Sequence, residues 1–157
     1  MQDGTKKFLF FDEFEHSLDV QRRFAVPSEW RYAGTDSSYV ITIGREGVLQ
    51  MYTSEMYDEM IYSKLKKMSP ANAKEARQLS MLGRKTWSGT CDKQGRIQLP
   101  QKLLDYAGLK VEDKICLNGS VLYAEILAPK RHIERQGDAG DEECLDLLER
   151  LHDGDGK

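Results

Sequence analysis

An internal repeat constrains this chain more than any other feature of its sequence. Residues 17–27 (SLDVQRRFAVP) align with residues 90–100 (TCDKQGRIQLP) at an offset of 73. Asp, Gln, Arg and Pro coincide at four of the nine positions from Asp to Pro, and apolar residues coincide at two more. Short matches arise by chance, so the elements that follow each copy must agree as well. Where they agree, the chain is expected to fold as two related halves.

The same order of elements follows both copies. Pro27 and Pro100 each suit the first position of a helix, where a missing N–H costs nothing. In the second copy, residues 101–107 have an apolar side, and Gly108 is a natural stop. We therefore expect a helix directly after each motif.

A hairpin pattern comes next in each copy. Apolar strand-like segments cover residues 39–43 and 48–52 on either side of a glycine-containing turn. Residues 114–117 and 121–127 surround an Asn-Gly pair, a turn sequence that matches the twist of antiparallel strands. The sequence thus predicts one hairpin in each half.

Helical segments follow both hairpins. Ser54 can cap a helix, a segment led by Ser69 and Pro70 links the two halves, and Pro129 opens a shorter helix in the second half. One side of the first helix is apolar, which fits either a core position or a promiscuous binding groove, and we expect the core. The residues on that side are Met56, Met60, Ile61, Leu65 and Met68.

The repeated motif has the form Asp-x-x-x-Arg, with Asp19 before Arg23 and Asp92 before Arg96. Across a turn, such an Asp can pair with the Arg or with loop N–H groups and fix the tip. The simplest interpretation is a turn staple. Two copies in register favour a pseudo-symmetric domain that presents paired basic loops.

The net charge of the chain is −3, which taken alone argues against a nucleic-acid partner. The charge is unevenly spread, however. Residues 134–157 hold nine acids and three bases, so residues 1–133 carry a net charge of +3. The regional count therefore permits a polyanion partner for the body.

The acidic segment, residues 134–157, is predicted to be a C-terminal tail. Residues 136–140 are typical of a linker, and residues 153–156 (DGDG) are expected to be disordered. Between them one amphipathic helix is expected, with apolar positions at Cys144, Leu145, Leu147, Leu148 and Leu151. The tail either keeps the protein soluble, which we favour, or competes with DNA for the basic face.

Around these motifs the sequence resembles the MraZ family of transcriptional regulators, relatives of the AbrB and SpoVT DNA-binding domains. The resemblance covers about residues 10–132 and rests on residues 13–19 (EFEHSLD), 23–27, 92–100 and 104–109 (LDYAGL). It implies an α+β fold of two pseudo-symmetric swapped-hairpin β-barrel repeats with flanking helices. It also implies that protomers close into a ring and bind direct DNA repeats in the promoter of the division and cell-wall gene cluster.

On that resemblance the chain divides into a first AbrB/SpoVT-like repeat with its helix at residues 1–68 and a linking helix at 69–85. The second repeat covers residues 86–133, and the acidic tail covers residues 134–157.

The same resemblance assigns the DNA-binding residues. Arg23 and Arg96 are the expected DNA contacts, and Asp19 and Asp92 are their positioning partners. Arg22 and Lys93 are plausible additional contacts. The resembling motifs have Lys-Gly-Arg where this chain has Gln-Arg-Arg at residues 21–23. If that backbone position needs a positive φ, Arg22 carries a strain of about 1 kcal/mol that glycine would avoid.

The sequence gives little support for an enzymatic function. His16, Ser17 and Asp19 lie on a presumed strand whose side chains alternate between faces, so they do not converge as a triad. His16 with Glu13 or Glu15 could bind a metal, but a packed or hydrogen-bonded histidine is the expected state. The sequence has no Gly-rich phosphate loop. We expect no catalysis, no cofactor, no metal and no small-molecule substrate.

The three cysteines, Cys91, Cys116 and Cys144, include no Cys-x-x-Cys pair, which argues against a disulfide framework or a zinc site. No export signal or membrane span is visible, so a cytoplasmic, nucleoid-associated protein without a membrane partner is expected. The expected partners are double-stranded DNA with direct repeats and the protein itself. The alternative is a ring-forming protein-interaction scaffold with weak or no DNA binding.

Overall fold

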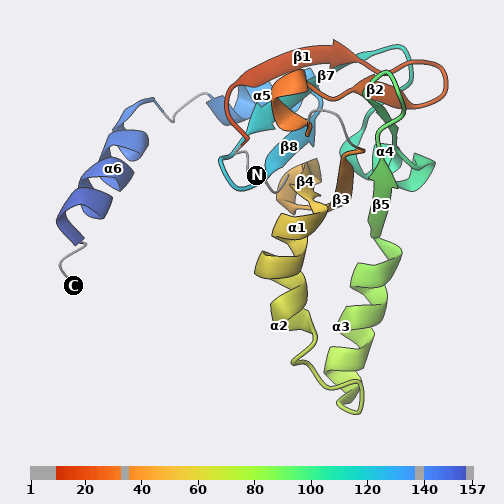
Figure 1. Ribbon diagram of the computed structural model, residues 1–157, viewed down its shortest axis with the longest axis vertical. Helices are drawn as coiled ribbons and strands as arrows, with labels where there is room; N and C mark the ends of the chain where they lie inside the picture. The colour runs from red at the N-terminus through yellow and green to blue at the C-terminus, as the bar shows by residue number, and fades with distance from the viewer. Residues whose placement is uncertain (1–9, 33–35, 137–139, 155–157) are drawn as a thin grey trace, which may run out of the picture.

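The computed structural model describes residues 10–32, 36–136 and 140–154. Figure 1 shows a β-rich body from which a helical segment projects, while α6 (Glu142–Gly154) lies at the C-terminal end of the chain. Most strands join one antiparallel sheet, so the molecule belongs to the expected α+β class.

The main sheet has six strands in the order β1-β7-β8-β4-β3-β5. A second sheet, which we call the ribbon, consists of β2 and β6. The bounds are β1 Glu13–Ser17, β2 Arg23–Ala25, β3 Ser38–Ile43, β4 Leu49–Thr53, β5 Thr86–Thr90, β6 Arg96–Gln98, β7 Lys114–Gly119 and β8 Ala124–Leu127.

Both predicted hairpins form, because β3 pairs with β4 and β7 pairs with β8 in antiparallel register. The turn of the second hairpin is not at Asn118 and Gly119, as predicted, because both residues belong to β7 and pair with Glu125 and Ala124. The turn lies at residues 120–123, and the last strand begins at Ala124, three residues after the predicted start. The reason lies at Val121, which adopts a φ of 67° and makes an isolated bridge with Phe10. Its backbone is therefore occupied outside the hairpin ladder.

The first strand of each half pairs with the other half. In the β1–β7 pair Phe14 lies opposite Leu117, and in the β5–β3 pair Trp87 lies opposite Ile41. Phe14 and Trp87 are 73 residues apart, the offset of the motif repeat. Neither half could therefore complete its part of the sheet without the other.

Two further pairs join equivalent positions of the halves. Phe24 lies opposite Ile97 in the ribbon, and Gln50 lies opposite Glu125 in the main sheet. If the two halves are exchanged, each residue of these pairs takes the place of its partner, so the pairs stay the same. Both pairs therefore lie on a local two-fold axis of the strand pairing.

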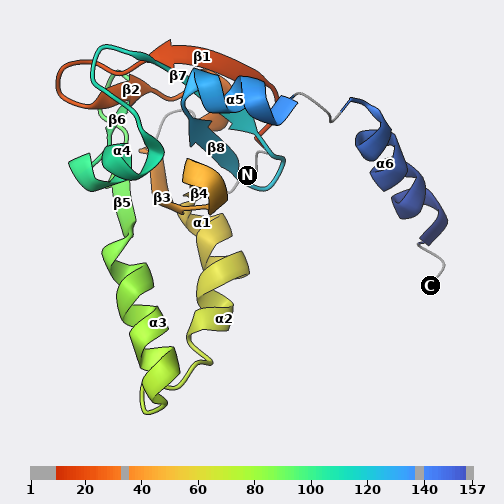
Figure 2. The same cartoon turned by 180° about the vertical axis from the view of Figure 1, so that it is seen from behind.

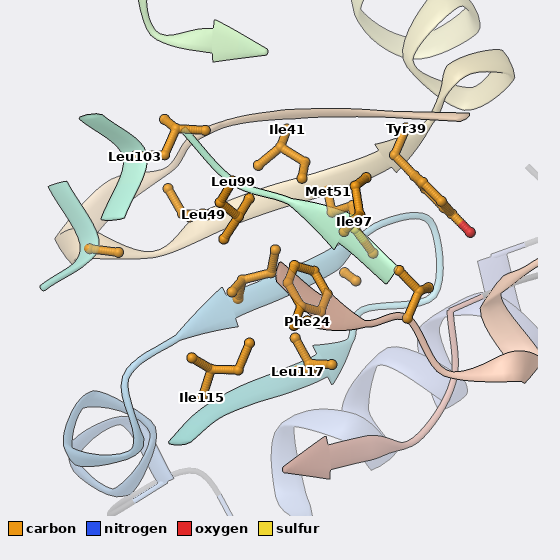
Figure 3. Packing of buried hydrophobic residues seen from close by; sticks show 14 of the residues in the cluster. Phe24, Tyr39, Ile41, Leu49, Met51, Ile97, Leu99, Leu103, Ile115 and Leu117 are labelled. Carbon is orange, nitrogen blue, oxygen red and sulfur yellow. The ribbon is translucent and has the colours of Figure 1, made fainter. Parts of the chain in front are cut away.

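The core fills the space between the ribbon and the main sheet. Figure 3 shows Phe24 and Ile97 of the ribbon packed over Met51 and Leu117 of the sheet. Beside them, fully buried Trp30 makes edge-on ring contacts with Phe10 and Phe14, at centroid distances of 5.2 and 5.3 Å. The ribbon is thus held by hydrophobic burial as well as by its few ladder hydrogen bonds.

The helix after the second motif, α4 (Gln101–Ala107), ends at Gly108 with a φ of 68°, as predicted. The first motif is followed only by a single 3-10 turn, η1 (Ser28–Trp30), where a helix was expected. Pro27 and Pro100 also lie one position earlier than predicted, at the N-cap of each element. The turn is short because Trp30 must enter the core, and the backbone at Arg31 returns to an extended conformation.

Residues 54–84 form the projecting part, which we call the helical hairpin (Figures 1 and 2). Thr53 caps its first helix by accepting a hydrogen bond from Met56 N, where Ser54 was predicted as the cap. Asn72 caps its last helix by accepting one from Glu75 N, whereas the sequence suggested Ser69 as the start. Its elements are α1 Ser54–Tyr57, the π-helical η3 Asp58–Tyr62, α2 Ser63–Leu65 and α3 Ala73–Arg84.

The prediction that the methionine-rich side of the first helix lies in the core is wrong. None of the helical-hairpin elements contains a fully buried residue. The stripe is only half-buried, because most of the hairpin projects away from the sheet (Figure 1), and only its base packs on the strands. Helical spacing indicates one apolar side, but it does not say what covers that side. The half-buried residues are Met56, Met60, Ile61, Leu65 and Met68.

Two helices follow the sheet. In the second half, α5 (Pro129–Gln136) opens at the predicted proline, and α6 (Glu142–Gly154) is the amphipathic helix expected in the tail. Asp153 and Gly154 belong to α6, so the expectation of disorder is wrong for them; the remaining residues of that stretch and residues 137–139 of the linker lie outside the described residues. Across the described ranges, no helix has the length and apolar character of a membrane span.

Candidate nucleic-acid interface

The ribbon presents two arginines on its outer face. Phe24 and Ile97 are each 1% exposed and point into the core. Because side chains alternate along a strand, their neighbours Arg23 and Arg96 lie on the opposite, outer face. The two arginines are diagonal neighbours across the two-fold axis, and such positions have Cα atoms about 7–8 Å apart. One antiparallel ribbon therefore carries both predicted DNA contacts.

The loop before β2 is held by Asp19. Its Oδ1 accepts hydrogen bonds from the backbone N–H of Gln21 at 2.9 Å and of Arg23 at 2.8 Å. Its Oδ2 accepts a hydrogen bond from Nε of Arg23 at 2.7 Å. The backbone closes the turn, since Arg22 N donates to Asp19 O at 3.0 Å. One carboxylate thus fixes both the turn and the arginine.

The loop before β6 repeats this arrangement atom by atom. Asp92 Oδ1 accepts from the N–H groups of Gln94 and Arg96 at 2.9 Å each, and Oδ2 accepts from Nε of Arg96 at 3.0 Å. Gly95 N donates to Asp92 O at 2.9 Å. The Asp–Arg pairs that the motif spacing predicts are therefore present in both loops.

Both carboxylates stay ionised near neutral pH. Partial desolvation opposes the charge of Asp19, but the hydrogen bonds from Arg23 and Gln21 outweigh it, so its pKa lies below the ordinary value. At Asp92 the backbone hydrogen bond from Arg96 is the main cause of a lowered pKa, and desolvation works against it. The Asp–Arg pairing therefore persists at the pH at which DNA would be bound.

Each arginine uses only Nε in its loop. Within the described part of the chain, the terminal amino groups of Arg23 and Arg96 make no further hydrogen bond, and the two side chains are 27% and 34% exposed. A guanidinium oriented through Nε keeps its outer edge available for a bidentate acceptor such as guanine O6 and N7. The arrangement orients two such edges outward from one ribbon.

Lys93 and Arg22, the two additional predicted DNA contacts, differ in how freely their side chains reach outward. Lys93 is exposed at the tip of the second loop, where it can reach a phosphate. Arg22 lies at the turn of the first loop with a φ of 64°, the left-handed conformation in which strain was expected. Its Nε donates to the carbonyl of Leu99 at 2.8 Å, so part of the Arg22 side chain holds the fold.

Arg31 is a further basic residue of this site that the sequence did not reveal. Its guanidinium lies over Gly95, where an added Cβ would approach Arg31 Nη1 to 2.5 Å. Its Nε donates to the carbonyl of Val26 at 3.0 Å, which is the equivalent of the bond from Arg22 to Leu99 in the other half. The carbonyl before the proline of each motif thus accepts a hydrogen bond from a guanidinium, but both arginines come from the first half: Arg31 bonds within it, and Arg22 reaches across to the second half. No short sequence pattern links Arg31 to Gly95.

These contacts predict different responses to two substitutions in the turns. Gly95→Ala should destabilise the fold by about 1–2 kcal/mol, since alanine is disfavoured at the positive φ of 78° and its Cβ would meet Arg31. Arg22→Gly should be close to neutral, because relief of about 1 kcal/mol of strain offsets a lost hydrogen bond worth about the same.

Urea unfolding of the two variants beside the parent chain measures both effects. Equal stability of Gly95→Ala and the parent would contradict the role given to the Arg31 contact. A loss of more than about 2 kcal/mol in Arg22→Gly would show that the bond to Leu99 matters more than the strain.

The residues considered for other chemistry have ordinary surroundings. His16 makes a hydrogen bond of 2.6 Å between Nδ1 and the carbonyl of Ala25. No group of three or more metal-ligating side chains occurs among the described residues. Burial raises the pKa of Cys91 to about 11 and also raises that of Cys116, so neither thiol is an activated nucleophile.

Comparison with known proteins places these features in a family. The chain is 33% identical over 127 residues to the "Transcriptional regulator MraZ" of a Roseiflexus species, an alignment that covers 78% of this chain and 83% of the relative. It is 37% identical over 106 residues to the protein of the same name from Clostridium beijerinckii, with 65% of this chain and 70% of the relative covered. No protein-family model matches the chain. The relatives nevertheless share most of their length with it, and the chain belongs to the MraZ family of transcriptional regulators.

Proposed function

We propose that this protein is a DNA-binding transcription regulator that contacts DNA with the outer face of the ribbon. The observation that carries the proposal is the pair of Asp-x-x-x-Arg loops with the same hydrogen-bond geometry, related by the local two-fold axis. A two-stranded ribbon is narrow enough to enter the major groove of DNA. Arg23 and Arg96 lie at this face with Asp19 and Asp92, and Lys93 is exposed at a loop tip. Arg22 and Arg31 are held beside the ribbon on the carbonyls of Leu99 and Val26.

In this proposal Arg23 and Arg96 read guanine edges, and Asp19 and Asp92 hold them in place. Lys93 and the outer part of Arg22 contact phosphates, which adds affinity but no sequence preference. Each neutralised phosphate releases counterions, so binding should strengthen as salt is lowered. A modest positive charge on the body is sufficient, since Arg23 and Arg96 lie on one face of the ribbon and Lys93 is exposed beside them.

The finer features of the resemblance belong to the same proposal. We propose that residues 1–68 and 86–133 are two swapped-hairpin β-barrel repeats joined by residues 69–85, a division supported by the exchange of first strands between the halves. Protomers would close into a ring and engage direct repeats in the promoter of the division and cell-wall gene cluster. Weak contacts on successive protomers then gain affinity through effective concentration.

The protein would act without catalysis, in the cytoplasm and in association with the nucleoid. A second candidate is a ring-forming scaffold for protein partners with weak or no DNA binding. The uncovered apolar side of α6 is the observation that favours this candidate.

A DNA-binding titration discriminates the two candidates. The probe is labelled DNA from upstream of the gene that encodes the chain, at two salt concentrations, with the full chain and with a chain lacking residues 134–157. We expect strong, salt-dependent binding, and higher non-specific affinity without the tail because nine acids and only three bases are removed. Absence of binding by both proteins would favour the scaffold.

A further inference from the structure

The last helix of the chain leaves its apolar side uncovered. Leu145, Leu147, Leu148 and Leu151 of α6 are between 44% and 56% exposed. Cys144, Leu147, Leu148 and Leu151 follow the i, i+3, i+4, i+7 spacing of one helix face. A stripe of this kind on a soluble protein marks a contact surface.

The rest of α6 is strongly acidic, which limits what can cover it. Five acids stand against one arginine: Glu142, Glu143, Asp146, Glu149 and Asp153, with Arg150. Two copies of α6 packed on each other would bring ten carboxylates together, so self-pairing is electrostatically unfavourable. A basic surface with exposed apolar side chains is the complementary partner.

The helical hairpin offers such a surface. Residues 64–84 of the helical hairpin contain six bases and a single acid, Glu75. On α3 the exposed residues Lys74, Arg77, Met81 and Arg84 follow one another at intervals of three and four, so they share one face of the helix. Met81 on this face is 52% exposed. Bases thus frame an uncovered apolar side chain.

We infer that α6 docks on this outer face of α3 in a second copy of the chain. Within one chain α6 leaves α3 uncovered, as the exposure of both faces shows. Only five residues, 137–141, separate α5 from α6, and they span at most about 18 Å. Figures 1 and 2 show that the end of α5 that leads to α6 lies on the side of the sheet body away from α3. Leucines of α6 would cover Met81 while its acids face Lys74, Arg77 and Arg84.

Disulfide trapping between full-length chains tests this docking in the absence of DNA. One chain carries Met81→Cys with Cys144→Ser, and a second chain of different size keeps the exposed native Cys144. Mild oxidation should yield a mixed disulfide at least fivefold above a control in which the new cysteine replaces Lys130, an exposed residue of α5. Cys91 and Cys116 are the same in all chains.

Charge reversal then tests the complementarity. Lys74→Glu with Arg77→Glu in the first chain should lower trapping at least fivefold, and Glu143→Lys with Glu149→Lys in the second chain should restore it. Circular dichroism checks that each variant keeps its fold. Trapping equal to the Lys130 control would overturn the inference, as would trapping that does not change on charge reversal.

Discussion

Replacing both Arg23 and Arg96 with alanine is expected to weaken binding to repeat-bearing promoter DNA by about a hundredfold. A bidentate arginine–guanine contact contributes about 1–3 kcal/mol, and the two arginines lie on one ribbon face, so both losses fall on the same complex. The fold should remain, since neither side chain enters the core. Fluorescence anisotropy with labelled DNA at several salt concentrations measures the affinity and its salt dependence.

The salt dependence separates two modes of contact. If the arginines read bases, the double variant should lose affinity with little change in the salt slope; if they contact phosphates, the slope should fall by about one for each arginine. A matched control removes the same charge elsewhere, with Lys66→Ala on the helical hairpin and Lys130→Ala on α5, and should change affinity less than threefold. Unchanged affinity and slope in the double variant would remove Arg23 and Arg96 from the interface.

Local features of the site follow from the sequence. The four-residue spacing of Asp and Arg predicts both loop pairs, because a carboxylate at that distance across a tight turn meets the guanidinium and the loop N–H groups. The absence of glycine at position 22 predicts strain there, and the φ of 64° at Arg22 agrees. The end of α4 at Gly108 is likewise set by residues close in sequence. The Asn118-Gly119 pair, in contrast, predicts a turn where the structure continues β7, because both residues pair with β8.

Contacts between distant residues could not be predicted in the same way. The placement of Arg31 over Gly95 depends on how the halves pack, and no motif joins those two positions. The burial of the apolar stripe of residues 56–68 could not be predicted either, since a core helix and a helix that projects from the body have the same spacing of apolar residues. Repetition in sequence indicates two related halves, while the pairing of each first strand with the other half emerges only in the folded chain.

Phe24→Ala is expected to cost about 3–5 kcal/mol of folding stability, the usual loss when a buried aromatic side chain is truncated. Phe24 is 1% exposed and lies on the two-fold axis opposite Ile97, directly beneath the face that carries Arg23. Since single domains are stable by only about 5–15 kcal/mol, a large part of the total would be lost. Urea unfolding followed by far-UV circular dichroism measures it.

Phe24→Ala tests whether the core supports the ribbon, and the double arginine variant tests whether the ribbon binds DNA. Arg23→Ala with Arg96→Ala should lose DNA affinity at unchanged urea midpoint, whereas Phe24→Ala should lower both, since the ribbon would lose its support. Phe24→Leu is the matched control; because leucine fills much of the same space, it should cost less than about 1.5 kcal/mol and keep DNA binding. A Phe24→Ala chain as stable as the parent would mean that the ribbon is not held by the core, and the outward orientation of Arg23 and Arg96 would need another cause.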